Sequence, residues 1–507
     1  MKINNKLFIA LTAVLLGFTS CDLEPEVYSD VLLDDYYKTE KQLATLIANA
    51  YSQMAGEYGY VFREGYWSLQ EYTSDEVVVP TRGTDWFDNG VPIKMHTHTW
   101  ETDTRDINNG WSFVYGGTTK CNDVLQKIKS FKGEDETQYD AVTKAGIAEA
   151  KVLRAFYHLL AMDVYGNATI DDGGEIKQRT RTEIFNWIEK EVKDNLSNLS
   201  RNVRYGSVTA SVAHAILAKL YLNAEVYTGT PRWQDVINEC DSIINGGYGY
   251  ALNPDYFTAF KKDNTGNKEI IFPVVFDEVY AQGNMFHLMT LHYVHQQIYN
   301  FTTPPWNGPC TLKSFYDKYD SSDARKAQWL VGPVQKDGVT LTYKVGDNTL
   351  DAILTPEVTT IQDPSAANTF EGARFAKFEI ESGIAHHANS DFPIYRYADI
   401  LLMKAEALMR LNGGTANADA LVLVNQVHTR AGLIGYTSLD LPELLNERGR
   451  ELAWEGHRRQ DQIRFGTFTS GSWEFMEAGE SPNRTIFPIP QWVLDANPGV
   501  YTQNNWK

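Results

Sequence analysis

The chain has 507 residues, of which 43% are hydrophobic and 22% charged, and its formal net charge is −19. This length and composition exclude disorder of the whole chain and allow a large buried core. The acidic balance, with no cluster of basic residues interleaved with aromatic ones, excludes nucleic acid as an expected partner.

The first twenty residues have the features of a secretory signal peptide. Two lysines precede an apolar run at 7–16, which is shorter than the roughly 20 residues that span a bilayer. Small residues stand directly before Cys21, as in a lipobox, so we predict that 1–20 are removed and that Cys21 is lipidated. Phe18 departs from the usual aliphatic residue, and ordinary cleavage near this point is the alternative. No linker interrupts 21–507, which predicts a single domain.

Apolar residues at helical spacing predict a mainly α scaffold. They recur on one face of the segments 148–162, 213–224 and 398–432. The third segment is broken by Asn-Gly-Gly at 412–414, which predicts an αα-hairpin of about the length of a tetratricopeptide unit. A further helix is predicted from Asp440 through Glu451, because Glu443 and Pro442 give its first turn the pattern of a capped N-terminus.

Two long stretches lack this period. Residues 75–111 and 251–382 mix Gly, Pro, Asn and aromatic residues, which predicts long loops and short strands laid over the helical base. The expected fold is therefore a tetratricopeptide-like helical scaffold with a loop-rich, partly β ligand-binding face.

Several blocks resemble the RagB/SusD family. They follow one another in the family's order at 149–167, 395–407, 425–432, 447–466 and 487–504. The most specific is 447–466, which contains Trp-Glu-Gly-His-Arg-Arg and ends in Arg-Phe-Gly. Because the blocks extend to the last residues in the right order, the chain is identified from its sequence as similar to this family.

The resemblance implies a function without catalysis. Family members are outer-membrane lipoproteins on the cell surface that bind oligosaccharides and cover a SusC-like TonB-dependent transporter. Acidic residues just after Cys21 are compatible with such display, with the outer membrane reached through the lipid anchor. Some members serve peptides instead, so a peptide-binding lid is the alternative. The Arg-Gly-x-Asp-Trp loop is similar to that of members handling fructans or α-glucans.

The loop at 80–90 is the first candidate binding site. A sugar ring needs an exposed aromatic plane with planar polar groups around it. Trp86 supplies the plane, and Arg82, Asp88 and Asn89 supply the polar groups. Family members place ligand contacts in the corresponding loop. The alternative is a tryptophan folded down to seal the loop.

The segment 303–310 is the second candidate. Its prolines stiffen the chain, so an aromatic ring here loses little entropy on binding. Trp306 and Asn307 would form a second wall, and Cys310 is either a weakly polar contact or a buried thiol. Cys121 and Cys240 are predicted to be buried thiols.

Arg374 and Tyr395 are further candidates, because each precedes a family-like helix at a point where side chains can reach the loop face. Ordinary packing is the alternative for both. His96 and His98 alternate with Trp100 as on a strand, which predicts packing rather than a metal site. The pair at 386–387 is isolated, and no metal or cofactor is expected.

A hydrolase is the least favoured alternative. Glu451 and Glu455 lie four residues apart, and hydrolysis would need two carboxylates about 5–10 Å apart across a cleft. Arg448, Arg458 and Arg459 stand three or four residues from them and would keep them ionised. The sequence therefore predicts a structural ion-pair network and no catalytic residue.

Overall fold

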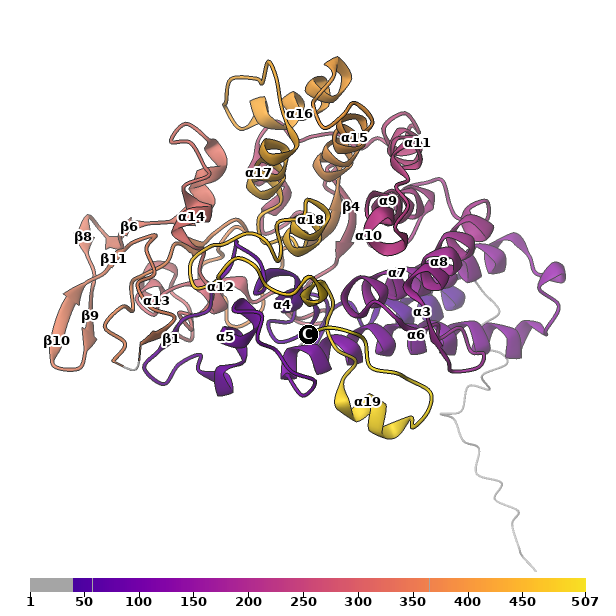
Figure 1. Ribbon diagram of the computed structural model, residues 1–507, viewed down its shortest axis with the longest axis horizontal. Helices are drawn as coiled ribbons and strands as arrows, with labels where there is room; N and C mark the ends of the chain where they lie inside the picture. Colours follow the sequence, from indigo (N-terminus) through magenta and orange to yellow (C-terminus); the bar gives the residue numbers. More distant parts are fainter. Residues whose placement is uncertain (1–39, 57, 364) are drawn as a thin grey trace, which may run out of the picture.

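The computed structural model describes residues 40–507 except 57 and 364, so the predicted signal peptide and Cys21 lie outside the described residues. Helices occupy one side and the top of the view in Figure 1, and short strands occupy the other side. No helix within the described ranges is both long enough and apolar enough to span a membrane.

A set of helices packed around a common core builds the scaffold. They are α3 (Glu40–Tyr51), α6 (Arg105–Lys132), α7 (Ala141–Tyr165), α8 (Arg181–Leu196), α9 (Ala210–Leu222), α10 (Ala224–Thr228), α11 (Trp233–Ile244), α15 (Tyr397–Leu411), α16 (Ala418–Arg430), α17 (Leu441–Leu452), α18 (Arg458–Arg464) and α19 (Gln491–Ala496). Neighbours in sequence pack in pairs, α6 with α7, α7 with α8 and α15 with α16, while α11 packs against both α9 and α15. This succession of helix pairs is the expected tetratricopeptide-like arrangement.

Helix α7 lies at the centre of the core. Asp140 caps its N-terminus by accepting a hydrogen bond from the Thr143 amide, and nearly every residue from Gly146 to Tyr165 is buried. Most of these residues are apolar or small, as a helix buried on all sides requires. The buried polar residues Glu149, Arg154, His158 and Asp163 each have a hydrogen-bond partner. The other helices are placed by packing around it.

Most of the strands and short helices form the loop face, whereas the strand pair at 168–169 and 178–179 lies beside α7 and α8. The strands are β1 (Thr81–Arg82), β2 (Ala168–Thr169), β3 (Gln178–Arg179), β4 (Ile270–Val274), β5 (Trp329–Leu330), β6 (Gly332–Pro333), β7 (Gln335–Lys336), β8 (Val339–Thr340), β9 (Thr342–Val345), β10 (Asn348–Asp351), β11 (Ile353–Leu354), β12 (Gln362–Asp363), β13 (Arg374–Phe375) and β14 (Phe392–Arg396). The short helices are α4 (Tyr66–Glu71), α5 (Val91–His96), α12 (Phe286–Thr290), α13 (His295–Tyr299) and α14 (Lys313–Tyr316), with 3-10 turns η1 (Asp88–Gly90), η2 (Glu136–Gln138), η3 (Tyr256–Phe260), η4 (Ala324–Gln328) and η5 (Pro482–Thr485).

Each sheet in the described part of the chain has two strands. The buried pair of β4 and β14 is antiparallel and joins the loop face to the helices, because Arg396 at its end leads directly into α15. The pair of β1 and β12 is parallel and supports the loop that follows Arg82. The loops therefore rest on short backbone ladders and not on a sheet of their own.

The predicted helices are confirmed. Segment 148–162 lies in α7, segment 213–224 covers α9 and the start of α10, and 398–432 forms the hairpin of α15 and α16. Helix α17 begins after Asp440, whose carboxylate accepts a hydrogen bond from the Glu443 amide at 3.0 Å. The stretch 251–382 contains short strands, short helices and loops, as expected.

The prediction of loops and short strands for 75–111 is wrong at 91–96, where α5 forms, and from Arg105 on, where the 28-residue helix α6 begins. Glycines obscured the signal of α6, because they serve close packing: a Cβ on Gly117 would lie 2.3 Å from the Tyr157 ring. His96 ends helix α5 and not a strand, and both His96 and His98 are buried with backbone carbonyls as partners.

The predicted ion-pair network is confirmed, and it is buried. The Glu451 carboxylate is fully buried and meets three guanidiniums, those of Arg325 at 3.1 Å, Arg396 at 2.5 Å, and Arg430. Burial raises the pKa of Glu451, but the three cations outweigh it and lower the pKa to about 2. An ionised carboxylate of this kind is suited to structure and not to proton donation.

The partners of the two glutamates are not the arginines three or four residues away in the sequence, which were the expected ones. Glu455 accepts from Arg396 at 2.6 Å and from Lys377, which come from β14 and the loop face. The remaining arginines reach other elements, in the pairs Arg448–Asp461, Arg458–Asp75 and Arg459–Asp163. The network therefore ties α17 and α18 to distant segments.

Substitution of Glu451 by glutamine should destabilise the fold strongly. Three buried guanidiniums would lose their shared counter-ion, so we expect the free energy of unfolding to fall by about 3–5 kcal/mol. Urea denaturation measures this change. The matched control Glu477→Gln alters an exposed glutamate and should leave the unfolding midpoint in place. A loss below about 1 kcal/mol in Glu451→Gln would contradict a structural role.

Candidate functional site

Two half-buried tryptophans from different loops lie side by side on the loop face. The ring centroids of Trp86 and Trp306 are 6.5 Å apart with an angle of 48° between the planes. The Trp86 indole Nε1 donates a hydrogen bond to the Trp306 carbonyl at 2.6 Å, so the loops hold each other. Neither tryptophan is sealed into the interior, because both indoles border an open groove.

The groove between the loops encloses about 570 Å³. It is lined by Arg63, Thr84, Asp85, Trp86, Asp88, Tyr293, Thr303, Pro304, Pro305, Trp306 and His386. This volume lies within the range of small-molecule sites, which combine apolar rings with a few fixed polar groups. Both candidate loops, at 80–90 and 303–310, therefore contribute to one site.

Glycine 308 makes room for the first indole. A Cβ on Gly308 would lie 2.1 Å from Trp86 Cε2, closer than any side chain permits. Trp86 itself has φ 60°, and its neighbours Asp88 and Asn89 have φ 42° and 56°. Such left-handed conformations in residues other than glycine cost about 1–3 kcal/mol each and cluster at functional sites. Asn307, next to Trp306, has φ 52° as well, so both loops of the groove carry this strain.

Arg63 is a groove residue that the sequence did not reveal. Its guanidinium lies 5.4 Å from the Trp86 ring centroid and 5.6 Å from that of Trp306, and it forms an ion pair with Glu64. A guanidinium over two indoles is attracted by both ring faces. Arg63 stands far from both loops in sequence, and only the fold places it there.

The far side of the groove is polar. The Tyr293 hydroxyl donates to the Asp85 carboxylate, and burial, followed by that carboxylate, raises the pKa of the phenol. Tyr293 also stacks on Tyr343 of β9, with centroids 5.3 Å apart. His386, from a pair that is isolated in the sequence, also borders the groove.

Of the exposed polar residues predicted in the first loop, one lines the groove and one does not. Asp88 lines the groove and lies 3.9 Å from Arg105. Asn89 is exposed within η1 and does not line the groove. Asp88 is therefore retained as a candidate contact, and Asn89 stands at the rim of the loop.

Three residues predicted to contact ligand are instead supports, because they are buried. The Asn307 amide donates to the Thr369 carbonyl at 3.0 Å, and its Oδ1 accepts from Arg374 at 2.8 Å. Arg82 donates to the Asn307 carbonyl at 3.0 Å and to the Glu371 carbonyl at 2.9 Å. Burial, followed by the nearby Arg82, lowers the pKa of Arg374 to about 9. These groups hold the backbone behind Trp306.

Cys310 and Tyr395 also lie away from the groove. Cys310 is fully buried and pairs its backbone with Val78, so the alternative of a buried thiol is the correct one. Cys121 and Cys240 are buried as predicted. Tyr395 lies on β14 in the core, with its ring 6.2 Å from that of Phe156.

Substitution of Gly308 by alanine should displace the Trp86 indole. The added methyl group needs the space that the ring occupies, at a cost of about 1–3 kcal/mol. Near-ultraviolet circular dichroism should report the altered tryptophan environment. The control Gly116→Ala lies in α6, where the new Cβ meets only the flexible end of Gln53 at 3.2 Å. Unchanged spectra in Gly308→Ala would show that the ring is not fixed by this glycine.

Comparisons with known proteins agree with this architecture. Residues 245–506 match the sequence profile of the SusD family, and residues 25–222 match a profile described as "Starch-binding associating with outer membrane". The starch-binding protein SusD of Bacteroides thetaiotaomicron is 24% identical over 477 residues, covering 83% of this chain and 82% of the relative.

Solved structures show the same fold. Surface glycan-binding protein A from Bacteroides thetaiotaomicron superposes with a TM-score of 0.74 at 20% identity, covering 93% of this chain and all of the other. Its complex with laminarihexaose gives 0.73 at 19% identity, covering 92% and 99%. The family profile spans more than half of the chain, from β4 through the buried ion-pair network to the C-terminal segment, and this chain therefore belongs to the SusD family.

Proposed function

We propose that the groove between Trp86 and Trp306 captures an oligosaccharide at the cell surface for delivery to a SusC-like TonB-dependent transporter of the outer membrane. The observation that carries the proposal is the pair of half-exposed indoles facing one groove. Sugar rings offer apolar C–H faces that stack on aromatic planes. Two planes inclined at 48° suit a chain that bends between successive rings.

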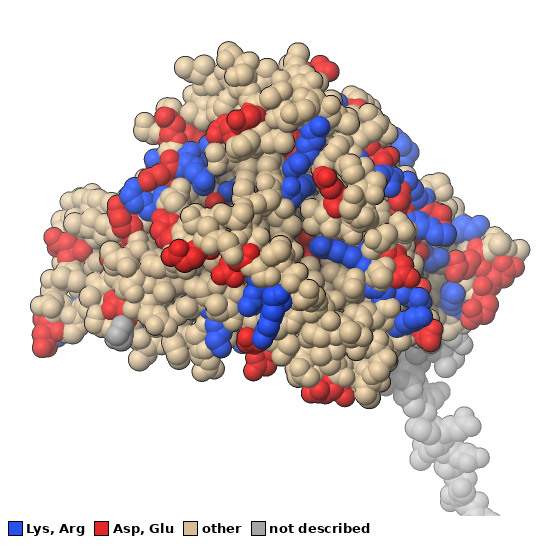
Figure 2. All heavy atoms as spheres, viewed as in Figure 1, with Lys and Arg blue, Asp and Glu red and all other residues tan. Residues whose placement is uncertain are grey.

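Polar groups around the indoles match the hydroxyl fringe of a sugar. Arg63 can donate, while Asp85 and Asp88 can accept, so both hydrogen-bonding senses are present. In Figure 2, charged side chains are sparser over the loop-rich side than over the helices opposite.

The named relatives support a glycan as the ligand. One is a starch-binding protein, and another was solved with laminarihexaose. Glu451 and Glu455 lie in the buried ion-pair network and outside the groove, so they offer no support for a hydrolase. Peptide capture is the second candidate, because Pro304 and Pro305 give the groove an apolar rim that peptides also use.

Trp86→Ala should weaken oligosaccharide binding about fivefold or more, since one stacking plane contributes about 1 kcal/mol or more. Isothermal titration with oligosaccharides from starch, laminarin and fructan measures this loss. The control Trp492→Ala removes an exposed tryptophan on α19, far from the groove in sequence, and should keep full affinity. Unchanged binding in Trp86→Ala would move the site elsewhere, and binding of unstructured peptides with no heat from any sugar would favour the second candidate.

Cys21→Ser should release the protein from the membrane. Without the thiol no lipid anchor can be attached, so the protein should move from the outer-membrane fraction to the soluble fraction. Fractionation followed by immunoblotting measures this, and Thr19→Ser serves as the control that keeps the cysteine. Retention of Cys21→Ser in the membrane would contradict a lipid anchor at this position.

A further inference from the structure

Two buried glutamates lie against the turn that joins α17 to α18. Glu71 ends α4, Glu76 follows it in the next loop, and both side chains are excluded from solvent. The Glu71 Oε1 atom accepts a hydrogen bond from the Gly456 amide at 2.6 Å. The Glu76 Oε2 atom accepts one from the Trp454 amide at 2.9 Å. The two carboxyl groups therefore hold the same turn.

This turn, at 453–456, is strained and joins several parts of the molecule. Trp454 has φ 60°, a left-handed conformation that is an outlier for a bulky residue. Its ring stacks on that of Phe375 in β13, with centroids 4.3 Å apart, and Glu455 belongs to the buried ion-pair network. Because a strained backbone persists only where its surroundings hold it, the two amide hydrogen bonds help to fix the turn.

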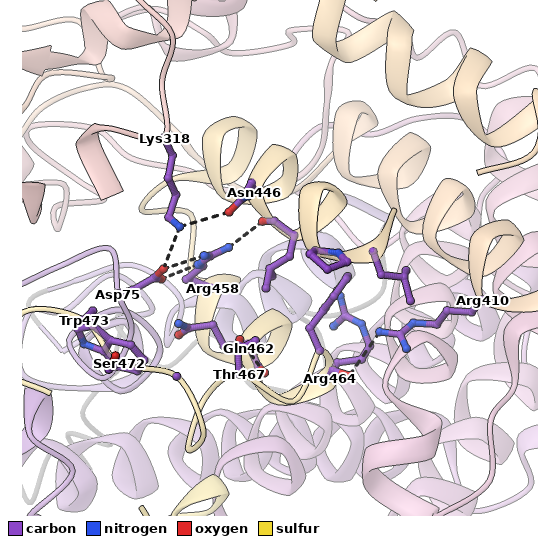
Figure 3. Close-up of a pocket in the computed structure, with 15 residues that line it drawn as sticks. Asp75, Lys318, Arg410, Asn446, Arg458, Gln462, Arg464, Thr467, Ser472 and Trp473 are labelled. Carbon is purple, nitrogen blue, oxygen red and sulfur yellow. Dashed lines mark hydrogen bonds and ion pairs between the residues drawn. The ribbon is translucent and has the colours of Figure 1, made fainter. Parts of the chain in front are cut away.

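The nearest guanidinium is already used by another carboxylate. Within the described part of the chain Glu71 forms no ion pair, and Glu76 has one distant cation, Arg458 at 3.8 Å. Figure 3 shows that Arg458 is directed at Asp75, to whose two oxygens it donates at 2.6 and 2.8 Å. Arg458 therefore neutralises Asp75 and not the two glutamates.

The other groups around the pair do not supply a counter-ion. The Lys377 ammonium donates to the Glu455 carboxylate and to the carbonyls of Glu451 and Ala453. The titratable and charged groups that face the two carboxyls are Arg458, Lys377, Asp75, Tyr60 and Tyr319. Two buried carboxylates without cations of their own are too costly to keep ionised together.

The contact between the two carboxyl groups provides the solution. Glu71 Oε2 has no N–H or hydroxyl donor among the described residues, and the side-chain group that it meets is the Glu76 carboxyl. Two ionised carboxylates repel each other, so this contact requires a proton between them. Burial raises the pKa of both glutamates, and the negative charge of Glu71 raises that of Glu76 further.

We propose that Glu71 and Glu76 share one proton and form a pH-sensitive clamp on the turn at 453–456. While the proton is bound, one carboxyl donates to the other and both keep their amide partners. Loss of the proton leaves two negative charges side by side in the interior, which weakens the hold on the turn. Neither glutamate lines the groove, so the clamp does not rest on the proposed function.

The pH dependence of stability follows from where the proton is held. Above the ordinary glutamate pKa of about 4.3 the unfolded chain has released it, whereas the folded chain still binds it. The stability that the pair contributes is therefore complete below that pH and is lost as the pH rises through the raised pKa. Over this window the unfolding equilibrium constant should grow about tenfold per pH unit.

Glu71→Gln tests the clamp in the mature protein. The glutamine amide can donate to Glu76 at every pH, in place of the shared proton, while its carbonyl accepts from Gly456. Urea denaturation between about pH 6 and pH 8 should show the variant gaining about tenfold over wild type in the unfolding equilibrium constant per pH unit. The control Glu477→Gln, at an exposed position, should follow wild type. Parallel pH dependence of wild type and Glu71→Gln would overturn the proposal.

Infrared difference spectroscopy detects the proton itself and needs no denaturation. At neutral pH wild type should show the carbonyl band of a protonated carboxyl group that Glu71→Gln lacks. Glu76→Gln replaces the other member of the pair and should lose the same band, so either variant gives the answer if the other fails to fold. Spectra without this difference would mean that both glutamates are ionised, and the clamp would be disproved.

Discussion

The loop face depends on two buried guanidiniums, which supply hydrogen bonds that the backbone would receive from neighbouring strands in a sheet. Irregular backbone leaves carbonyl groups without ladder partners, and such groups cannot be buried unpaired. Arg82 and Arg374 meet this requirement by donating to the carbonyls of Asn307, Thr369 and Glu371. Because these carbonyls belong to the segments behind Trp306, the arginines fix where the indole stands. The groove is a consequence of that constraint.

The buried ion pairs around Glu451 hold the helical scaffold and the loop face in position relative to each other. They join α17 to β14 through Arg396 and to the loop face through Arg325. Buried pairs add little net stability compared with apolar packing, but they tolerate few alternative arrangements. We therefore regard them as setting the register between scaffold and loops, with stability supplied by the apolar core around α7.

Much of the scaffold could be predicted from the sequence, because helical periodicity is local. The signal failed for α6, where Gly110 and Gly117 are used for contact with Tyr165 and Tyr157 and so resemble loop glycines. The two indoles were also predictable, since tryptophans beside glycines and prolines favour exposed, stiff loops. Arg63 was not, because its position over both rings arises only from the fold.

The buried residues that support the groove were wrongly predicted to contact a ligand, and the reason is physical. Arg82 was expected to hydrogen-bond a ligand because of its place in the loop at 80–90. Arg374 was a candidate because it precedes a family-like helix, with ordinary packing as the alternative. In the structure backbone carbonyls take the place of a carboxylate, which no spacing in the sequence can show. Tyr395 failed similarly, since its ring packs on Phe156 of α7 and Phe272 of β4, which lie far before it in the sequence.

The central claim is that a sugar ring occupies the space beside the two indoles. A crystal structure of the protein with a bound oligosaccharide tests it most directly. The account predicts ring carbons within about 4 Å of the Trp86 or Trp306 plane, with Arg63 or Asp88 hydrogen-bonded to the sugar. A sugar bound at another surface, with this groove empty, would contradict it.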